Sequence, residues 1–268
     1  MLRLQLRYLS FFLGLISILS FFNILYSYYL NLYLNLDTYY LSLLCSIIIS
    51  IFFYKIKTTE IKANIYSKIL TVFFGYILIP VVLSIPFYFS IYNLTFLNSY
   101  FESISGFTST GFTIFENIKH IDQSLLIWRS TSQWFGGLYF LISILFLIDI
   151  YDENYKKILT NFISLDIYEI IKQSTKILFV YVSITLALFV IYKIINLRFF
   201  DAFNLSLTII SSGGFLIVNN INEILQSDFQ IYVFSLTMLI SFFGILLPYN
   251  ILFLKKKDIF VFTEDFYL

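Results

Sequence analysis

The chain has 268 residues, of which 59% are hydrophobic and only 12% are charged, and its formal net charge is +1. Such a composition is typical of a polytopic membrane protein, whose main partner is the lipid bilayer, and we expect no nucleic-acid partner. The single cysteine, Cys45, excludes a disulfide framework within one chain and any metal site with several cysteine ligands.

Six apolar segments are long enough to cross a bilayer, which predicts an all-α polytopic membrane protein with six transmembrane helices. They cover residues 8–30, 38–54, 69–91, 125–148, 177–197 and 229–254. The first segment follows Arg3 and Arg7 and exceeds the length of a signal-peptide core, so it is expected to be retained. Most lysines and arginines lie on the side that holds the N-terminus, and the positive-inside rule therefore places both termini in the cytoplasm.

Two polar, glycine-bearing segments lie between these spans, at residues 101–113 and 200–215. Backbone that is neither helix nor closed barrel is tolerated at membrane depth only where protein or water surrounds it, because each unsatisfied amide costs several kcal/mol in hydrocarbon. Both segments are therefore predicted to be pore loops that re-enter the membrane from the outside.

The two pore loops belong to an internal repeat with a shift of 103 residues, which relates Asn98 to Asp201 and Gly111 to Gly214. Each unit consists of an outer helix, a short helix with a polar turn, and an inner helix, and two extra transmembrane helices precede the first unit. Asn98 and Asp201 stand before the polar turns at the positions where the short helices are expected to begin, so we predict that they are N-caps.

A short helix that ends in mid-membrane directs the negative end of its dipole toward the centre, where it favours a cation. The turns that follow, 108–111 and 211–214, are uncharged but rich in carbonyl and hydroxyl oxygens, which can replace water around a weakly hydrated cation. Among the rare charges in the spans, Glu102 and Arg129 are expected to form an ion pair that supports these turns. The alternative is that Arg129 extends to the outer surface while Glu102 faces water.

The first unit resembles the first pore repeat of the Trk-type bacterial potassium uptake proteins of the Trk/Ktr/HKT superfamily. The resemblance lies in the motif SGFTSTG at 105–111, followed by WR at 128–129 and QWFGG at 133–137. The second unit likewise resembles the second repeat of that family, through FDAF at 200–203, SLTI at 206–209 and GGF at 213–215. The resemblance covers essentially the whole chain. Because that family has four repeats around one pore, it implies that this chain is the N-terminal half only.

The resemblance implies a membrane pore subunit that transports potassium as its substrate, with no cofactor and no other metal. The implied potassium-binding residues of the selectivity filter are Thr108, Ser109, Thr110, Gly111, Ser211, Ser212, Gly213 and Gly214. It also implies a cytoplasmic nucleotide-binding regulatory subunit, a homodimeric assembly and a location in the bacterial cytoplasmic (inner) membrane.

Five parts of the chain follow from the repeats and the resemblance. They are an N-terminal helix pair at 1–68, a first pore repeat at 69–150, a cytoplasmic linker at 151–176, a second pore repeat at 177–254 and a cytoplasmic tail at 255–268 that leads to an absent third repeat. A truncated or split gene product is expected, so a second half is required. That half is either another polypeptide with two further repeats or a second copy of this chain.

Two other classes of protein compete with a transporter. A membrane enzyme would need converging carboxylates, histidines or a nucleophile, and the spans lack them apart from Glu102 and Asp201, so we expect no enzyme. The alternative is a non-conducting accessory subunit or an inactive fragment. An accessory subunit would tolerate bulky residues at Gly111 and Gly214, whereas a transporter would not. The sequence contains no glycine-rich nucleotide-binding loop with its lysine, which indicates passive or weakly coupled cation flow rather than a pump.

Overall fold

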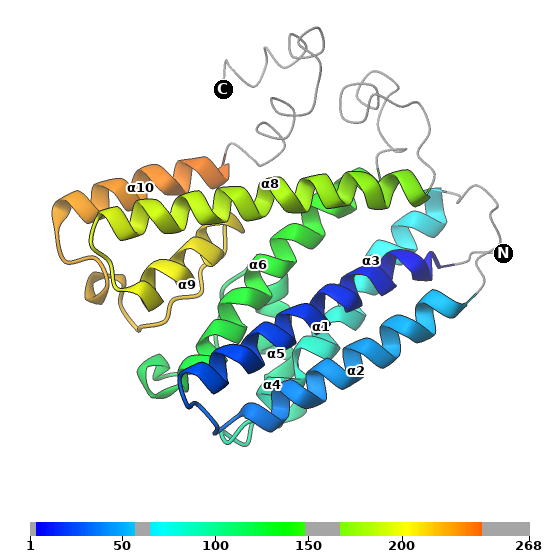
Figure 1. Cartoon of the computed structure of the whole chain (residues 1–268), viewed down its shortest axis with the longest axis horizontal. Helices are drawn as coiled ribbons and strands as arrows, with labels where there is room; N and C mark the ends of the chain where they lie inside the picture. The colour runs from blue at the N-terminus through cyan, green and yellow to red at the C-terminus, as the bar shows by residue number, and fades with distance from the viewer. Residues whose placement is uncertain (1–3, 57–64, 148–166, 243–268) are drawn as a thin grey trace, which may run out of the picture.

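The computed structural model describes residues 4–56, 65–147 and 167–242, which form helices and loops without a strand. The helices are α1 (Leu6–Tyr29), α2 (Leu36–Lys55), α3 (Ile65–Leu83), α4 (Ile85–Tyr88), α5 (Phe96–Phe107), η1 (Ile118–His120), α6 (Gln123–Phe146), α8 (Ile167–Ile194), α9 (Phe199–Ile210), η3 (Ile221–Glu223) and α10 (Asp228–Phe242). Figure 1 shows α1 and α2 as an antiparallel pair beside α3 and α5, with α6 between this group and the group of α8, α9 and α10.

The α1–α2 pair is joined by a short turn and packs through small residues. Asn31 ends α1 in the left-handed region at φ 56°, and the N–H of Leu32 donates to the carbonyl of Ser27 at 2.8 Å. This arrangement satisfies the last carbonyls of α1 without a glycine. Further along the pair, the hydroxyl of Ser50 donates to the carbonyl of Ser10 at 2.8 Å, a contact that small side chains on facing helices allow in a membrane.

Four helices of the described chain are long and apolar enough to cross a membrane: Leu6–Tyr29, Leu36–Lys55, Ile65–Tyr88 and Ser174–Ile194. They correspond to four of the six predicted spans. The fifth predicted span, at 125–148, corresponds to α6. With 24 residues this helix is long enough to cross a membrane, but its polar side chains distinguish it from the four apolar helices. Most of those side chains, Arg129 and Gln133 among them, are buried in protein and so do not meet lipid. The sixth begins in α10, and its residues 243–254 lie outside the described residues.

The N-terminal boundary of α8 differs from the sequence expectation. The helix begins at Ile167, whereas the apolar run that predicts the span begins at 177. Lys172 and Lys176 interrupt that run, but lysine is a good helix former, so the helix continues through both positions. Residues 151–166 of the predicted linker and the whole predicted tail at 255–268 lie outside the described residues.

The repeat is visible in the structure from the end of each outer helix to the outer loop. The short helices α5 and α9 have 12 residues each and start 103 positions apart, as do η1 and η3. Left-handed backbone recurs at the same shift, at Asn93 and Asn196 and again at Ser109 and Ser212. The inner helices depart from this register, because α10 starts 105 positions after α6 and its connector is therefore two residues longer.

The predicted N-caps are wrong in both units. Helix α5 begins after Thr95, whose hydroxyl accepts the N–H of Asn98 at 3.3 Å, so Asn98 is the third residue of the helix. Helix α9 begins after Arg198, and the carboxylate of Asp201 accepts a hydrogen bond from the guanidinium of Arg198 at 2.6 Å. A threonine three positions earlier caps α5 in the usual geometry, while a carboxylate in the first turn of α9 interacts favourably with the positive end of the helix dipole.

Candidate ion-binding turns and the Glu102–Arg129 network

The turns that follow α5 and α9 face each other. A Cβ on Gly111 would lie 2.8 Å from the Cα and 2.9 Å from the nitrogen of Gly214, so the two chains touch backbone to backbone at this point. Gly111 also has φ +81°, a conformation that an L side chain rarely adopts. The structure thus brings together the two glycines that the sequence repeat relates.

Both turns close in the same way. The N–H of Thr110 donates to the carbonyl of Ser105 at 2.9 Å, and at the equivalent place the N–H of Gly213 donates to the carbonyl of Thr208, also at 2.9 Å. These bonds use the last carbonyls of each short helix and leave those of the turns themselves unused. In the described part of the chain, no hydrogen bond reaches the backbone carbonyl oxygens of Thr108, Ser109, Thr110, Gly111, Ser211, Ser212, Gly213 and Gly214.

The hydroxyl groups of the turns are placed less uniformly than their carbonyls. Thr108 donates to the carbonyl of Ile104 at 2.8 Å and contacts the hydroxyl of Thr110 at 2.7 Å. Ser211 is buried and donates back to the carbonyls of its own helix. Thr108, Thr110 and Ser212 are exposed. The unbonded oxygens of this site are therefore mainly backbone carbonyls, with hydroxyl groups that stabilise the turns.

The paired glycines of α6 separate the ends of the two short helices. A Cβ on Gly136 would lie 1.9 Å from the carbonyl oxygen of Phe107, the last residue of α5. A Cβ on Gly137 would lie 2.6 Å from the hydroxyl of Tyr181 and 2.8 Å from the Cβ of Ser211, which follows α9. Both glycines therefore allow close packing, which is their usual role in membrane helices.

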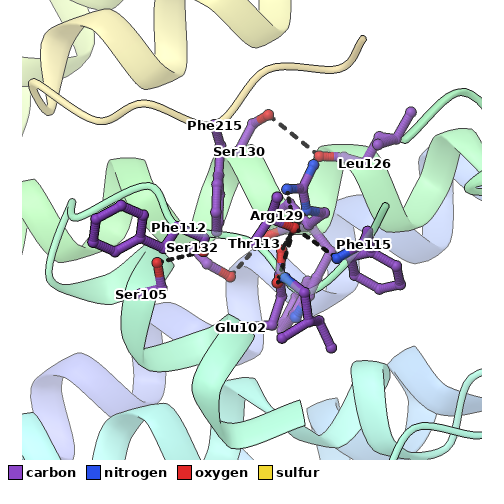
Figure 2. A network of polar contacts seen from close by, with 12 residues as sticks. Glu102, Ser105, Phe112, Thr113, Phe115, Leu126, Arg129, Ser130, Ser132 and Phe215 are labelled. Carbon is purple, nitrogen blue, oxygen red and sulfur yellow. Dashed lines mark hydrogen bonds and ion pairs between the residues drawn. The ribbon is translucent and has the colours of Figure 1, made fainter. Parts of the chain in front are cut away.

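Glu102 and Arg129 form a fully buried ion pair beside the first turn (Figure 2). Arg129 Nε donates to Glu102 Oε1 at 2.8 Å, and the exposed fractions of the two side chains are 1% and 0%. Glu102 also accepts from the hydroxyl of Thr113 at 3.0 Å and from the N–H of Ile114 at 3.0 Å. The pairing is the one that the sequence analysis expected, and the burial excludes the alternative in which Arg129 reaches the outer surface.

Arg129 also contacts the segment that follows the second turn. Its Nη1 donates to the carbonyl of Leu216 at 3.1 Å, and its guanidinium carbon lies 4.3 Å from the ring centre of Phe215. The remaining amine, Nη2, donates to the hydroxyl of Thr113 at 3.1 Å. One side chain on α6 thus holds the segments that follow both turns, and every polar end of the buried pair has partners, as a buried charge requires.

Gln133, one turn further along α6, was not singled out as a site residue in the sequence. Its Oε1 accepts the N–H of Phe215 at 3.2 Å, and a Cβ on Gly213 would lie 2.3 Å from the same oxygen. The side chain is fully buried, and its amide nitrogen has no hydrogen-bond partner among the described residues. A glutamine four positions after a buried arginine places both on one helix face, which is the signal that could have identified it.

No metal site of the usual kind accompanies the turns. The described residues contain no group of three or more histidine, cysteine, aspartate or glutamate side chains that could hold a metal ion. Backbone carbonyls and hydroxyl groups, together with the ends of two helices, are therefore the groups that this region offers to an ion.

The chain is similar in sequence to proteins that are named as cation transporters. It is 26% identical over 218 residues to an uncharacterized cation transporter of Methanocaldococcus jannaschii, covering 77% of this chain and 44% of the relative. It is 41% identical over 56 residues, or 20% of this chain and 12% of the relative, to the Trk system potassium uptake protein TrkH of Escherichia coli K12. No family model matches.

Among solved structures, the crystal structure of the potassium transporter TrkH from Vibrio parahaemolyticus matches 89% of this chain and 48% of that chain, with a TM-score of 0.69 and 20% identity. In sequence and in fold, the chain is similar to part of the Trk system potassium uptake proteins. The chain spans about half the length of the two relatives that match most of it. Its all-helical membrane fold agrees with the sequence analysis, and the relatives named here are transporters.

Proposed function

We propose that the chain forms one half of a potassium pathway through the membrane, in which the carbonyls of the two turns hold the dehydrated ion. The observation that carries this proposal is the meeting of Gly111 and Gly214, with unbonded carbonyl oxygens in both turns. Rings of such oxygens replace the hydration shell of an ion in cation-selective filters. Similarity to proteins named as potassium transporters supports potassium as the substrate.

The electrostatics of the region favour a cation. Helices α5 and α9 both end at the turns, so both direct the negative ends of their dipoles to the same place. The residues of the two turns carry no charge, and the guanidinium of Arg129 is neutralised by Glu102. A membrane potential would drive the ion through by about 2.3 kcal/mol per charge per 100 mV.

Two units supply half of a four-sided filter. The exposed residues of the turns are polar or glycine, and they include Thr108, Thr110, Ser212 and Gly214. Such backbone would be costly against lipid, so a further half with two more units is part of the proposal. In this scheme the pore repeats are residues 69–150 and 177–254, and an extra helix pair precedes them at residues 1–68. The segments that face the cytoplasm are residues 151–176 and 255–268.

The remaining parts of the proposal concern the assembly. A cytoplasmic nucleotide-binding subunit regulates the pore, two complete pores form a homodimer, and the protein lies in the bacterial cytoplasmic membrane with both termini inside. These features follow the resemblance to Trk-type proteins. The distribution of lysine and arginine along the chain supports the orientation.

Replacement of Gly111 by alanine tests the proposal. We expect potassium flux to fall to background in membranes where the wild-type chain supports it, because the new Cβ would meet the Gly214 backbone at 2.8 Å and φ +81° would be strained. Flux and membrane insertion are measured together. Gly14→Ala is the matched control, since a Cβ there would meet only the Ser50 hydroxyl at 3.7 Å. Wild-type flux in Gly111→Ala would instead support the accessory-subunit alternative.

A further inference from the structure

Phe112 and Phe215 occupy the same place in the two units but differ sharply in exposure. Each directly follows the glycine of its turn, and the two are 103 positions apart. Phe215 is 3% exposed, whereas Phe112 is 69% exposed. The difference is not explained by the residue type, which is phenylalanine in both units, so it must come from what each unit has beside it.

Phe215 is buried because residues of the first unit pack around its ring, and we call this group of residues its seat. Its ring lies 4.3 Å from the Arg129 guanidinium carbon, and a Cβ on Gly106 would lie 3.0 Å from the ring. Its N–H is held by Gln133. The seat thus consists of a cation and an amide on the inner helix α6 and a glycine on the short helix α5. The phenylalanine of the second unit is seated in the first unit.

Phe112 has a fixed backbone and a ring that is not seated. Its carbonyl accepts the hydroxyl of Ser105 at 2.6 Å, which anchors the main chain. Figure 2 shows the ring of Phe112 apart from the group around Arg129, with which Phe215 is in contact. Thr110 and Thr113 beside it are also exposed, and polar residues of a pore loop are poor neighbours for lipid. The ring therefore belongs to a surface that another protein segment covers.

We propose that Phe112 is the anchor by which this chain binds its missing half, and that the ring is seated against an α6-like inner helix outside residues 1–268. The inference rests on the proposed half-pore. If each unit seats its phenylalanine in the unit before it, the first unit uses the last unit of the other half. Buried aromatic anchors of this kind carry much of the binding energy of an interface.

A second copy of this chain does not offer such a seat. In a ring of two copies, Phe112 would face α10 of the other copy. Between Asp228 and Phe242 this helix has no arginine or lysine, and α9 has no glycine, whereas the seat of Phe215 contains Arg129 of α6 and Gly106 of α5. The partner that fits is instead an apolar helix with small residues and a basic residue near the level of the turn.

A photo-crosslinking experiment tests this assignment without relying on ion flux. Benzoylphenylalanine replaces Phe112 in the full chain in its native membrane, and the crosslinked peptide is sequenced. Phe22, which is 61% exposed on α1 far along the chain from the turns, carries the probe in the control. We expect the probe at 112 to capture a glycine-bearing apolar helix that follows a polar turn and lies outside this sequence, and the probe at 22 to capture lipid.

Two results would overturn the assignment: capture of lipid alone at 112, or capture of a differently tagged second copy of this chain. A binding measurement provides the second arm. Phe112→Ala is expected to reduce recovery of the captured half by at least about tenfold, while Phe112→Leu restores part of it and neither change lowers the melting temperature of this chain. A lowered melting temperature for Phe112→Ala would mean that the ring stabilises this chain itself. Successful capture with no flux in any variant would leave the anchor intact and reject the transport function.

Discussion

Replacement of Gly136 by alanine is expected to abolish potassium flux and to destabilise the fold. The added Cβ would lie 1.9 Å from the carbonyl oxygen, 2.5 Å from the carbonyl carbon and 2.8 Å from the Cα of Phe107. All three are backbone atoms at the end of α5, so no side-chain rotation relieves the clash and the first turn must move. Overpacking typically costs about 1–3 kcal/mol, and rigid backbone places this site at the upper end of that range.

The experiment compares flux and melting temperature in Gly136→Ala, Gly137→Ala and Gly14→Ala. Gly137→Ala is expected to be milder because its closest contact is the hydroxyl of Tyr181, which Tyr181→Phe removes. The double variant Gly137→Ala/Tyr181→Phe should therefore recover part of the lost stability. Normal melting and flux in Gly136→Ala would show that α6 does not press against the end of α5.

Replacement of Glu102 by glutamine is expected to lower the free energy of unfolding by about 3–5 kcal/mol, since it leaves the guanidinium of Arg129 buried without a counter-charge. Glutamine preserves the size of the side chain, so the effect reports charge rather than packing. The segments after both turns should loosen, because Arg129 also holds the carbonyl of Leu216. Denaturant unfolding in lipid-like micelles measures the change, and flux should fall with it.

The matched control is Glu223→Gln, which makes the same chemical change in an ion pair at the surface. Lys119 and Glu223 lie 2.6 Å apart but are 54% and 33% exposed, so the loss should be at most about 1 kcal/mol. Equal losses at the two positions would contradict the proposed support of the turns by the buried pair.

Exchange of the charges, Glu102→Arg with Arg129→Glu, should rescue only part of the lost stability. The ion pair itself can re-form, but the N–H of Ile114 would lose its carboxylate and the carbonyl of Leu216 would lose its guanidinium. If the ion pair were the only contact that mattered, the double exchange would restore stability in full. Because the backbone contacts are lost, we expect the recovery to be partial. Complete recovery would show that the backbone contacts of the pair contribute little.

Much of the fold could be predicted because the chain repeats itself. The shift that relates Gly111 to Gly214 also relates α5 to α9, so one motif fixes the register of both short helices and their turns. Helix starts were harder to predict. Asn98 and Asp201 have good capping side chains, but Thr95 and Arg198 precede the helices, since a cap depends on where the chain enters and not on residue type alone.

The candidate site was predictable in its residues but not in its contacts. The sequence identifies the turns and the two buried charges, because polar groups stand out among apolar ones. It does not reveal that Gln133 holds Phe215 or that Gly136 packs on Phe107, since these contacts join segments far apart in the chain. They depend on how α6 is rotated about its axis, and packing against several helices at once decides that rotation.

Helix α6 has a mechanical consequence for the two halves of the described structure. Within nine residues, from Arg129 to Gly137, it contacts the end of α5, the residue after α9 and the segments beyond both turns. A tilt or rotation of this helix would therefore displace both sets of oxygens in concert. We therefore expect the shapes of the two turns to be coupled through this one helix.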